Sequence, residues 1–113
     1  MEESILISIK KLLGLGEDYT HFDTDIIMHI NSVLMTLNQL GVGPAEGFFI
    51  EDAQQYWEDF IEDPTRLQAV KSYIYLKVRL LFDPPQGTGL IEAMERQAKE
   101  LEWRLNVAAE TSD

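Results

Sequence analysis

Hydrophobic residues recur along this chain at intervals of three and four, which is the spacing of one face of an α-helix. The densest region is residues 66–82, where a turn of 100° per residue gives two apolar stripes instead of one. The stripes consist of Leu67, Val70, Ile74, Val78 and Leu81, and of Ala69, Tyr73, Leu76 and Leu80. A helix that is apolar on two sides has to be covered on both. We therefore expect a central helix whose second stripe is covered in part by another copy of the chain.

Four further segments show the same helical spacing. They are Glu2–Leu13, a segment from Asp23 or Thr24 to Leu40, Ala53–Ile61, and Leu90–Val107. Asp23 or Thr24 is expected to cap its helix. Asp63 is expected to cap the central helix, with Pro64 in the first turn, where its missing N–H costs nothing. The sequence DPP at residues 83–85 ends that helix.

Two segments lack a clear pattern. Residues 47–51 (GFFIE) are too short to assign and leave room for a brief extended strand, and residues 108–113 are expected to form a frayed tail. No internal repeat and no long linker divides the chain. The sequence therefore predicts an all-α fold with a single domain over residues 1–113. It is a compact bundle of four to five helices with one long central helix and a C-terminal helix.

Acidic residues are concentrated in the first half of the chain. The net charge is −11, and residues 1–65 hold 13 acidic residues against two lysines, whereas residues 66–113 hold seven of each sign. Residues 46–63 contain seven acids and no base. This balance argues against tight binding to nucleic-acid phosphates or to anionic membranes, which both require basic side chains. A role in solubility alone explains the charge equally well.

The chain contains no cysteine, which excludes disulfides, thiol catalysis and cysteine-ligated zinc. The first residues, MEESILISIKK, lack the basic start and the long apolar run of a signal peptide. No apolar run approaches the length that spans a bilayer. We expect an intracellular protein that does not contact a membrane.

One cluster could carry metal chemistry, because Asp25 and His29 are four residues apart on a predicted helix and His21 and Asp23 precede them. The alternative is that both aspartates serve the start of the helix. The chain has two histidines in all and no third strong ligand nearby, so we expect neither a metal nor a cofactor. The paired acids of residues 51–63 lack the unequal environments that acid–base catalysis requires. We therefore expect no enzyme activity.

Aromatic and basic residues on the central helix suggest a subunit interface. Tyr75 and Phe82 fall on its polar side beside Arg79, and aromatic residues next to arginine are typical interface anchors. The predicted interface set is Tyr73, Tyr75, Lys77, Arg79 and Phe82. Basic residues of this helix could meet the acidic residues 46–63 of a neighbouring copy. Such a head-to-tail contact closes into a ring if the rotation allows it.

The order of several segments resembles the head–tail connector (adaptor) proteins of tailed phages and prophages. The segments are ISIKKLLGL, DTDIIMHINSVLMTLNQLGVGP, FFIEDAQQYWEDFIEDP, LQAVKSYIYLKVRLLFDPP and LEWRLNVAAE, and they cover almost the whole chain. The resemblance implies a structural protein that forms a homo-oligomeric ring on the portal protein and extends the DNA channel. It also implies a docking surface for a stopper or tail-completion protein.

The same resemblance implies a place at the head–tail junction of the virion, after synthesis in the cytoplasm of the bacterial host. DNA passes through such a ring without specific binding, and an acidic wall suits this because it cannot release counterions from phosphates. The acids that we expect to face the channel are Glu51, Asp52, Glu58 and Asp59. The expected portal-docking residues are Trp103 and Arg104.

A second interpretation is a small acidic binding module that mimics DNA and occupies the basic groove of a nucleic-acid-binding protein. The acids of residues 44–63 favour this module, but a mimic does not need the strongly apolar segment Tyr73–Phe82. Neutralising the four acids named above separates the two interpretations. Loss of partner binding with oligomerisation intact favours the mimic, whereas loss of a ring after changes at Tyr75 and Phe82 favours the connector.

Overall fold

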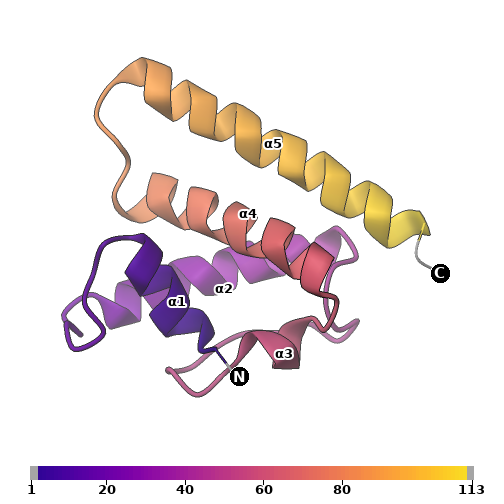
Figure 1. The fold of residues 1–113 in the computed structure, drawn as a ribbon, viewed down its shortest axis with the longest axis horizontal. Helices are drawn as coiled ribbons and strands as arrows, with labels where there is room; N and C mark the ends of the chain where they lie inside the picture. Colours follow the sequence, from indigo (N-terminus) through magenta and orange to yellow (C-terminus); the bar gives the residue numbers. More distant parts are fainter. Residues whose placement is uncertain (1–2, 112–113) are drawn as a thin grey trace.

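The computed structural model describes residues 3–111, which form five helices and no β-strand (Figure 1). The helices are α1 (Ile5–Leu12), α2 (Asp23–Gln39), α3 (Trp57–Phe60), α4 (Pro64–Phe82) and α5 (Thr88–Thr111). The predicted all-α bundle with a long central helix and a C-terminal helix is confirmed.

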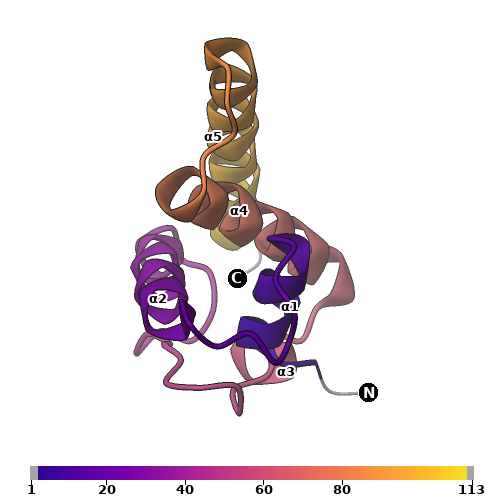
Figure 2. The ribbon, with the colours of Figure 1, turned by 90° about the vertical axis from the view of Figure 1, so that its left-hand side faces the viewer.

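Helix α4 lies in the middle of the fold. Helices α1 and α2 pack against one side of it and α5 against the other (Figure 2). The middle of both apolar stripes of α4 is thereby covered within the chain, and the buried residues are Val70, Tyr73, Ile74, Leu76 and Val78. Leu81, at the end of the first stripe, remains 53% exposed. The second stripe faces α5. Leu80 of this stripe remains half-buried, so the expectation that another copy of the chain covers part of the helix stays a prediction.

The start of α4 agrees with its predicted cap. The Asp63 side chain accepts a hydrogen bond from the Thr65 N–H (3.0 Å), and Pro64 occupies the first helical position. The helix ends at Phe82, and Asp83 separates it from the two prolines, which cannot continue it. These signals are local in sequence, which is why they could be interpreted without the fold.

The start of α2 differs from the prediction. The residue at the cap position is Phe22, and its side chain forms no capping hydrogen bond, so neither Asp23 nor Thr24 caps this helix. Asp23 is instead drawn toward α1, where its Oδ1 lies 2.9 Å from the Nζ of Lys10. Lys10 is 1% exposed and also donates to the Glu17 carbonyl (3.1 Å). Asp23 thus forms an ion pair with a buried lysine and does not cap α2.

The segment at residues 47–51 forms no strand. The Asn31 side chain on α2 makes the hydrogen bonds that a neighbouring strand would make. Its Nδ2 donates to the Ile50 carbonyl (2.9 Å), and its Oδ1 accepts from the Ile50 N–H (2.7 Å). One side chain thus satisfies both backbone groups of Ile50. No regular ladder is required.

The boundaries of other helices also differ from the prediction, most of all those of α3 and the end of α5. Only Trp57–Phe60 is helical in the segment predicted as Ala53–Ile61, although the two expected anchors, Trp57 and Phe60, are buried. At the other end, α5 continues through Thr111, whereas we expected the chain to fray from residue 108. Residues 112 and 113 lie outside the described part of the chain.

The Lys10–Asp23 pair provides a stability test. Replacing Lys10 by alanine should lower the free energy of unfolding by about 2 kcal/mol, because it leaves the partly buried carboxylate of Asp23 without its cation. Lys11 is exposed, and Lys11→Ala should change the stability by less than about 0.5 kcal/mol. Urea denaturation followed by circular dichroism measures both. Equal effects of the two substitutions would show that the buried pair contributes nothing specific.

Candidate interaction surfaces

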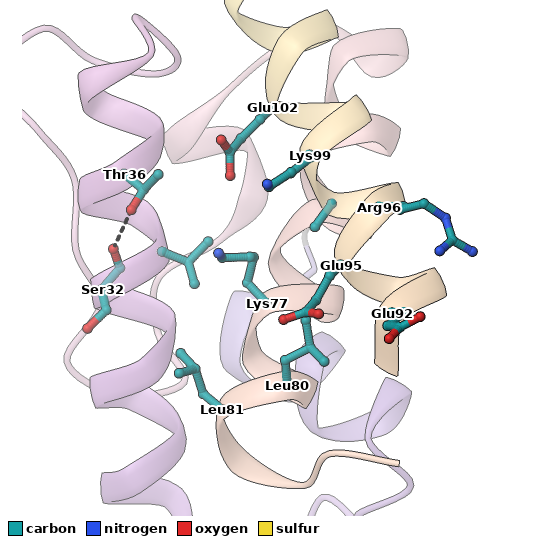
Figure 3. A pocket seen from close by; sticks show the side chains of 12 residues that line it. Ser32, Thr36, Lys77, Leu80, Leu81, Glu92, Glu95, Arg96, Lys99 and Glu102 are labelled. Atoms are coloured by element: carbon teal, nitrogen blue, oxygen red, sulfur yellow. Dashed lines mark hydrogen bonds between the residues drawn. The ribbon is translucent and has the colours of Figure 1, made fainter. Parts of the chain in front are cut away.

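A groove lies between α2 and α5, with α4 as its floor (Figure 3). Its volume is about 800 Å³. Leu80 and Leu81 of α4 contribute apolar surface, and Lys77 of the same helix points into the opening. Sequence reasoning missed this groove, since Leu81 belongs to an apolar stripe and was expected to be covered.

Tyr73, a member of the predicted interface set, is fully buried inside the chain. Its hydroxyl donates a hydrogen bond to the Glu102 carboxylate on α5 (2.7 Å). Burial, and then this carboxylate partner, raise the pKa of Tyr73 well above its usual range. Tyr73 therefore joins α4 to α5 and offers no surface to a neighbouring copy.

Three other members of the interface set are half-buried and also make contacts within the chain. Arg79 donates to the Tyr75 hydroxyl (3.0 Å) and to the Asp83 carbonyl (2.9 Å) at the end of α4. Phe82 packs edge-on against Phe22, with 5.2 Å between the ring centroids. Together with the groove residue Lys77, these residues remain candidates for contact with another copy only through their exposed parts.

The histidine and aspartate cluster is dispersed by other contacts. His21 lies against Phe22 (4.7 Å between ring centroids), and His29 lies near Phe82 (6.4 Å). Asp23 is paired with Lys10. Within residues 3–111, no three histidine, aspartate or glutamate side chains come together in a way that could hold a metal ion.

The acids that we expect to face a channel are all exposed, on and directly before α3. Two of them support local turns: Asp52 accepts from the Gln54 N–H (2.8 Å) and Asp59 from the Tyr56 N–H (3.1 Å). Glu51 precedes this turn. Helix α3 lies on the side of the molecule away from α5 (Figures 1 and 2). The acidic surface and the C-terminal helix are therefore well separated.

The expected portal-docking residues lie on α5. Trp103 is 67% exposed, the highest value among the large hydrophobic residues of the described chain. It is about 200° around the helix from the buried Leu105, so it points away from α4. Arg104 donates twice to Glu100, at 2.7 and 3.1 Å. The outer face of α5 thus presents one large aromatic side chain beside an ion pair.

Comparison with known proteins identifies the family. The family model described as phage connector protein matches residues 5–112. The chain belongs to the phage connector protein family. Neither a curated protein nor a solved structure matches it. The predicted head–tail connector family is thereby confirmed, and the connector family is a structural one, whose role lies in the virion.

The described part of the connector also bears on the membrane prediction. No helix within residues 3–111 is both long and apolar enough to cross a bilayer. The two longest helices, α4 and α5, each carry several charged residues along their length.

The raised pKa of Tyr73 predicts that the connector loses stability in alkaline solution. In the unfolded chain the phenol ionises near pH 10, whereas in the folded chain it resists ionisation. The contribution of Tyr73 to the free energy of unfolding is fully present below pH 10 and is lost as the pH rises further. Denaturant unfolding at pH 8 and pH 11 should show a smaller alkaline loss for Tyr73→Phe than for the wild type. Tyr19→Phe, at an exposed tyrosine, is the control, and an identical loss in all three proteins would contradict the prediction.

Proposed function

We propose that this connector forms a homo-oligomeric ring beneath the portal protein, extends the DNA channel, and gives a stopper or tail-completion protein its docking surface. The observation that carries the proposal is the family match over residues 5–112. The exposed acids around α3 and the exposed Trp103 on α5 supply two separate surfaces of different chemistry. Such a ring uses the first toward DNA and the second toward the portal.

The mass of the purified protein across a concentration series tests the ring. Light scattering after size exclusion, with negative-stain images of the largest species, should show a closed ring with a central hole. If the protein is monomeric alone, the same measurement is repeated with the portal protein of the same phage as a template. A monomer that does not bind the portal would contradict the proposal and favour the acidic binding module.

The acidic surface has its own test in the assembled ring. The double variant Glu58→Gln and Asp59→Asn should bind double-stranded DNA several-fold more tightly at low salt, because repulsion of the phosphates is removed. The difference in DNA affinity between the variant and wild-type rings should decrease toward 1 M salt, where the charges are screened. A ring with Glu17→Gln and Asp18→Asn, at two exposed acids between α1 and α2, is the control. Equal DNA retention by both variant rings would remove Glu58 and Asp59 from the channel wall.

A further inference from the structure

We propose that the groove between α2 and α5 receives the Phe49 loop of a neighbouring copy, where the Phe49 loop means residues 46–52. The inference rests on the proposed ring and names the two surfaces that meet within it. It is carried by the exposure of one aromatic anchor, by the charges around that anchor, and by the position of both surfaces on α2.

The Phe49 loop has the chemistry of an anchor. The Phe49 side chain is 66% exposed, and the exposed acids Glu46, Glu51 and Asp52 flank it in sequence. In this contact Glu51 and Asp52 face the neighbouring copy, which leaves Glu58 and Asp59 as the acids toward the channel. An aromatic side chain of this size gains most when it enters a pocket from which water is excluded.

The loop is held in place before any partner arrives. Asn31 binds both backbone groups of Ile50, and the Gln55 Oε1 accepts from the N–H groups of Glu51 (2.8 Å) and Asp52 (3.0 Å). Because these bonds fix the backbone that directly follows Phe49, little further ordering is needed on binding.

The groove complements this loop. Its floor offers Leu80 and Leu81, of which Leu81 is 53% exposed. Lys77 and Lys99 point into the opening (Figure 3), and neither forms an ion pair within residues 3–111. An apolar floor with two unpaired cations matches a phenylalanine flanked by carboxylates.

Acids also line the groove, and their positions limit where the loop can lie. Glu102 already accepts the Tyr73 hydroxyl, whereas Glu92 and Glu95 lie on the α5 wall, nearer its N-terminal end. The most favourable position for the Phe49 loop is therefore the side of the groove toward α2, where Lys77 and Leu81 face the α2 residues that line it.

The two surfaces lie on opposite flanks of α2. The groove is lined from α2 by Ser32, Val33 and Thr36, and the hollow beside Phe49 by Asn31, Leu34, Met35 and Asn38. At 3.6 residues per turn, these two sets are centred about 160° apart around the helix. A head-to-tail contact needs two different surfaces, and a ring of many copies needs them to face nearly opposite directions.

The face of α2 between the two surfaces carries no charge. Residues 26–45 contain no aspartate, glutamate, lysine or arginine, and Met28 and Met35 are exposed on this face. Two copies that each carry a net charge of −11 can approach here without placing like charges opposite one another. Depletion of charge with exposed methionine is typical of the core of an interface.

Photo-crosslinking tests the contact while keeping an aromatic anchor. The photoreactive p-benzoylphenylalanine is placed at position 49 of the full chain, and the assembled ring, with the portal protein as template where needed, is irradiated. We expect a covalent dimer whose cross-linked peptide comes from the groove, on α4 or the facing part of α2. The reagent at position 19, another exposed aromatic position, is the control and should give no such dimer.

A second variant tests the groove itself. Adding Leu81→Asp to the chain with the reagent at position 49 should lower the dimer yield about tenfold or more, since a carboxylate would then face the aromatic ring.

The outcomes separate this inference from the proposed function. Rings that give no dimer from position 49, or a dimer mapped outside the groove, overturn the inference and leave the connector proposal standing. Absence of both rings and cross-linked dimers, with and without the portal, overturns both. A dimer yield unaffected by Leu81→Asp also overturns the assignment of the groove.

Discussion

Replacing Trp57 by alanine should lower the free energy of unfolding by about 4 kcal/mol, the largest stability effect that we expect from a single substitution. The side chain is fully buried. Its indole Nε1 donates a hydrogen bond to the Ser8 hydroxyl on α1 (3.0 Å), and the Lys71 ammonium of α4 lies over the ring, 5.4 Å from its centroid. The substitution removes a core side chain and two contacts to other helices, so it weakens the packing of α3 on both α1 and α4.

Urea denaturation followed by circular dichroism measures this loss. Trp57→Phe is the matched control, because it keeps most of the apolar volume but removes the indole N–H, and it should cost about half as much. A loss below about 1 kcal/mol for Trp57→Ala would mean that the segment of α3 contributes little to the core. Equal losses for the two variants would place the whole effect in the hydrogen bond to Ser8.

The parts of the fold that were predicted correctly depend on chemistry local in sequence. Asp63 and Pro64 mark the start of α4 because a short acid and a proline satisfy a helix start on their own. The end of α2, predicted at Leu40 and observed at Gln39, is set in the same way by the glycines that follow it. Gly43 has a φ of +88° and lies so close to the Phe60 ring that a Cβ atom would overlap it. The turn could be predicted from the sequence, but the contact with Phe60 could not.

The parts that could not be predicted depend on which distant residues meet. Asp23 has the sequence features of a cap, and only the position of Lys10 on α1 turns it into half of an ion pair. Likewise, the two stripes of α4 show that two faces must be covered, but periodicity cannot distinguish α5 of the same chain from a second copy. The presence of α5 over the second stripe could therefore not be predicted, and contact with a partner copy stays a prediction for the exposed end of α4.

The candidate interaction surfaces also divide into features that local sequence predicts and features that depend on distant contacts. Tyr75 and Phe82 were recognised as unusual because they break the helical pattern, yet the structure gives both of them contacts within the chain. Leu81 fits the pattern and is nevertheless exposed, because it faces the groove between α2 and α5. Exposure at the end of a regular stripe is decided by where the neighbouring helices lie, which a single sequence does not contain.

The second tryptophan is expected to matter for binding and not for folding. Trp103→Ala should change the free energy of unfolding by less than about 0.5 kcal/mol, because the side chain is largely exposed on the outer face of α5. Under the proposed portal-docking role, the same substitution should weaken binding to the portal protein about 100-fold, as expected for a tryptophan at the centre of an interface. Leu90→Ala, at another exposed apolar residue of α5, is the matched control and should weaken binding by less than about fivefold.

Titration calorimetry with the portal protein measures the binding, and the variant itself simplifies the stability measurement. The chain has two tryptophans, so Trp103→Ala leaves the buried Trp57 as the only one, and its fluorescence reports unfolding of the core directly. Unchanged portal binding would remove Trp103 from the docking surface without affecting the ring. A large loss of stability would instead show that the outer face of α5 is part of the fold. Only the combination of unchanged unfolding and weakened binding places this tryptophan in an interface, because exposure alone does not distinguish an anchor from an ordinary surface residue.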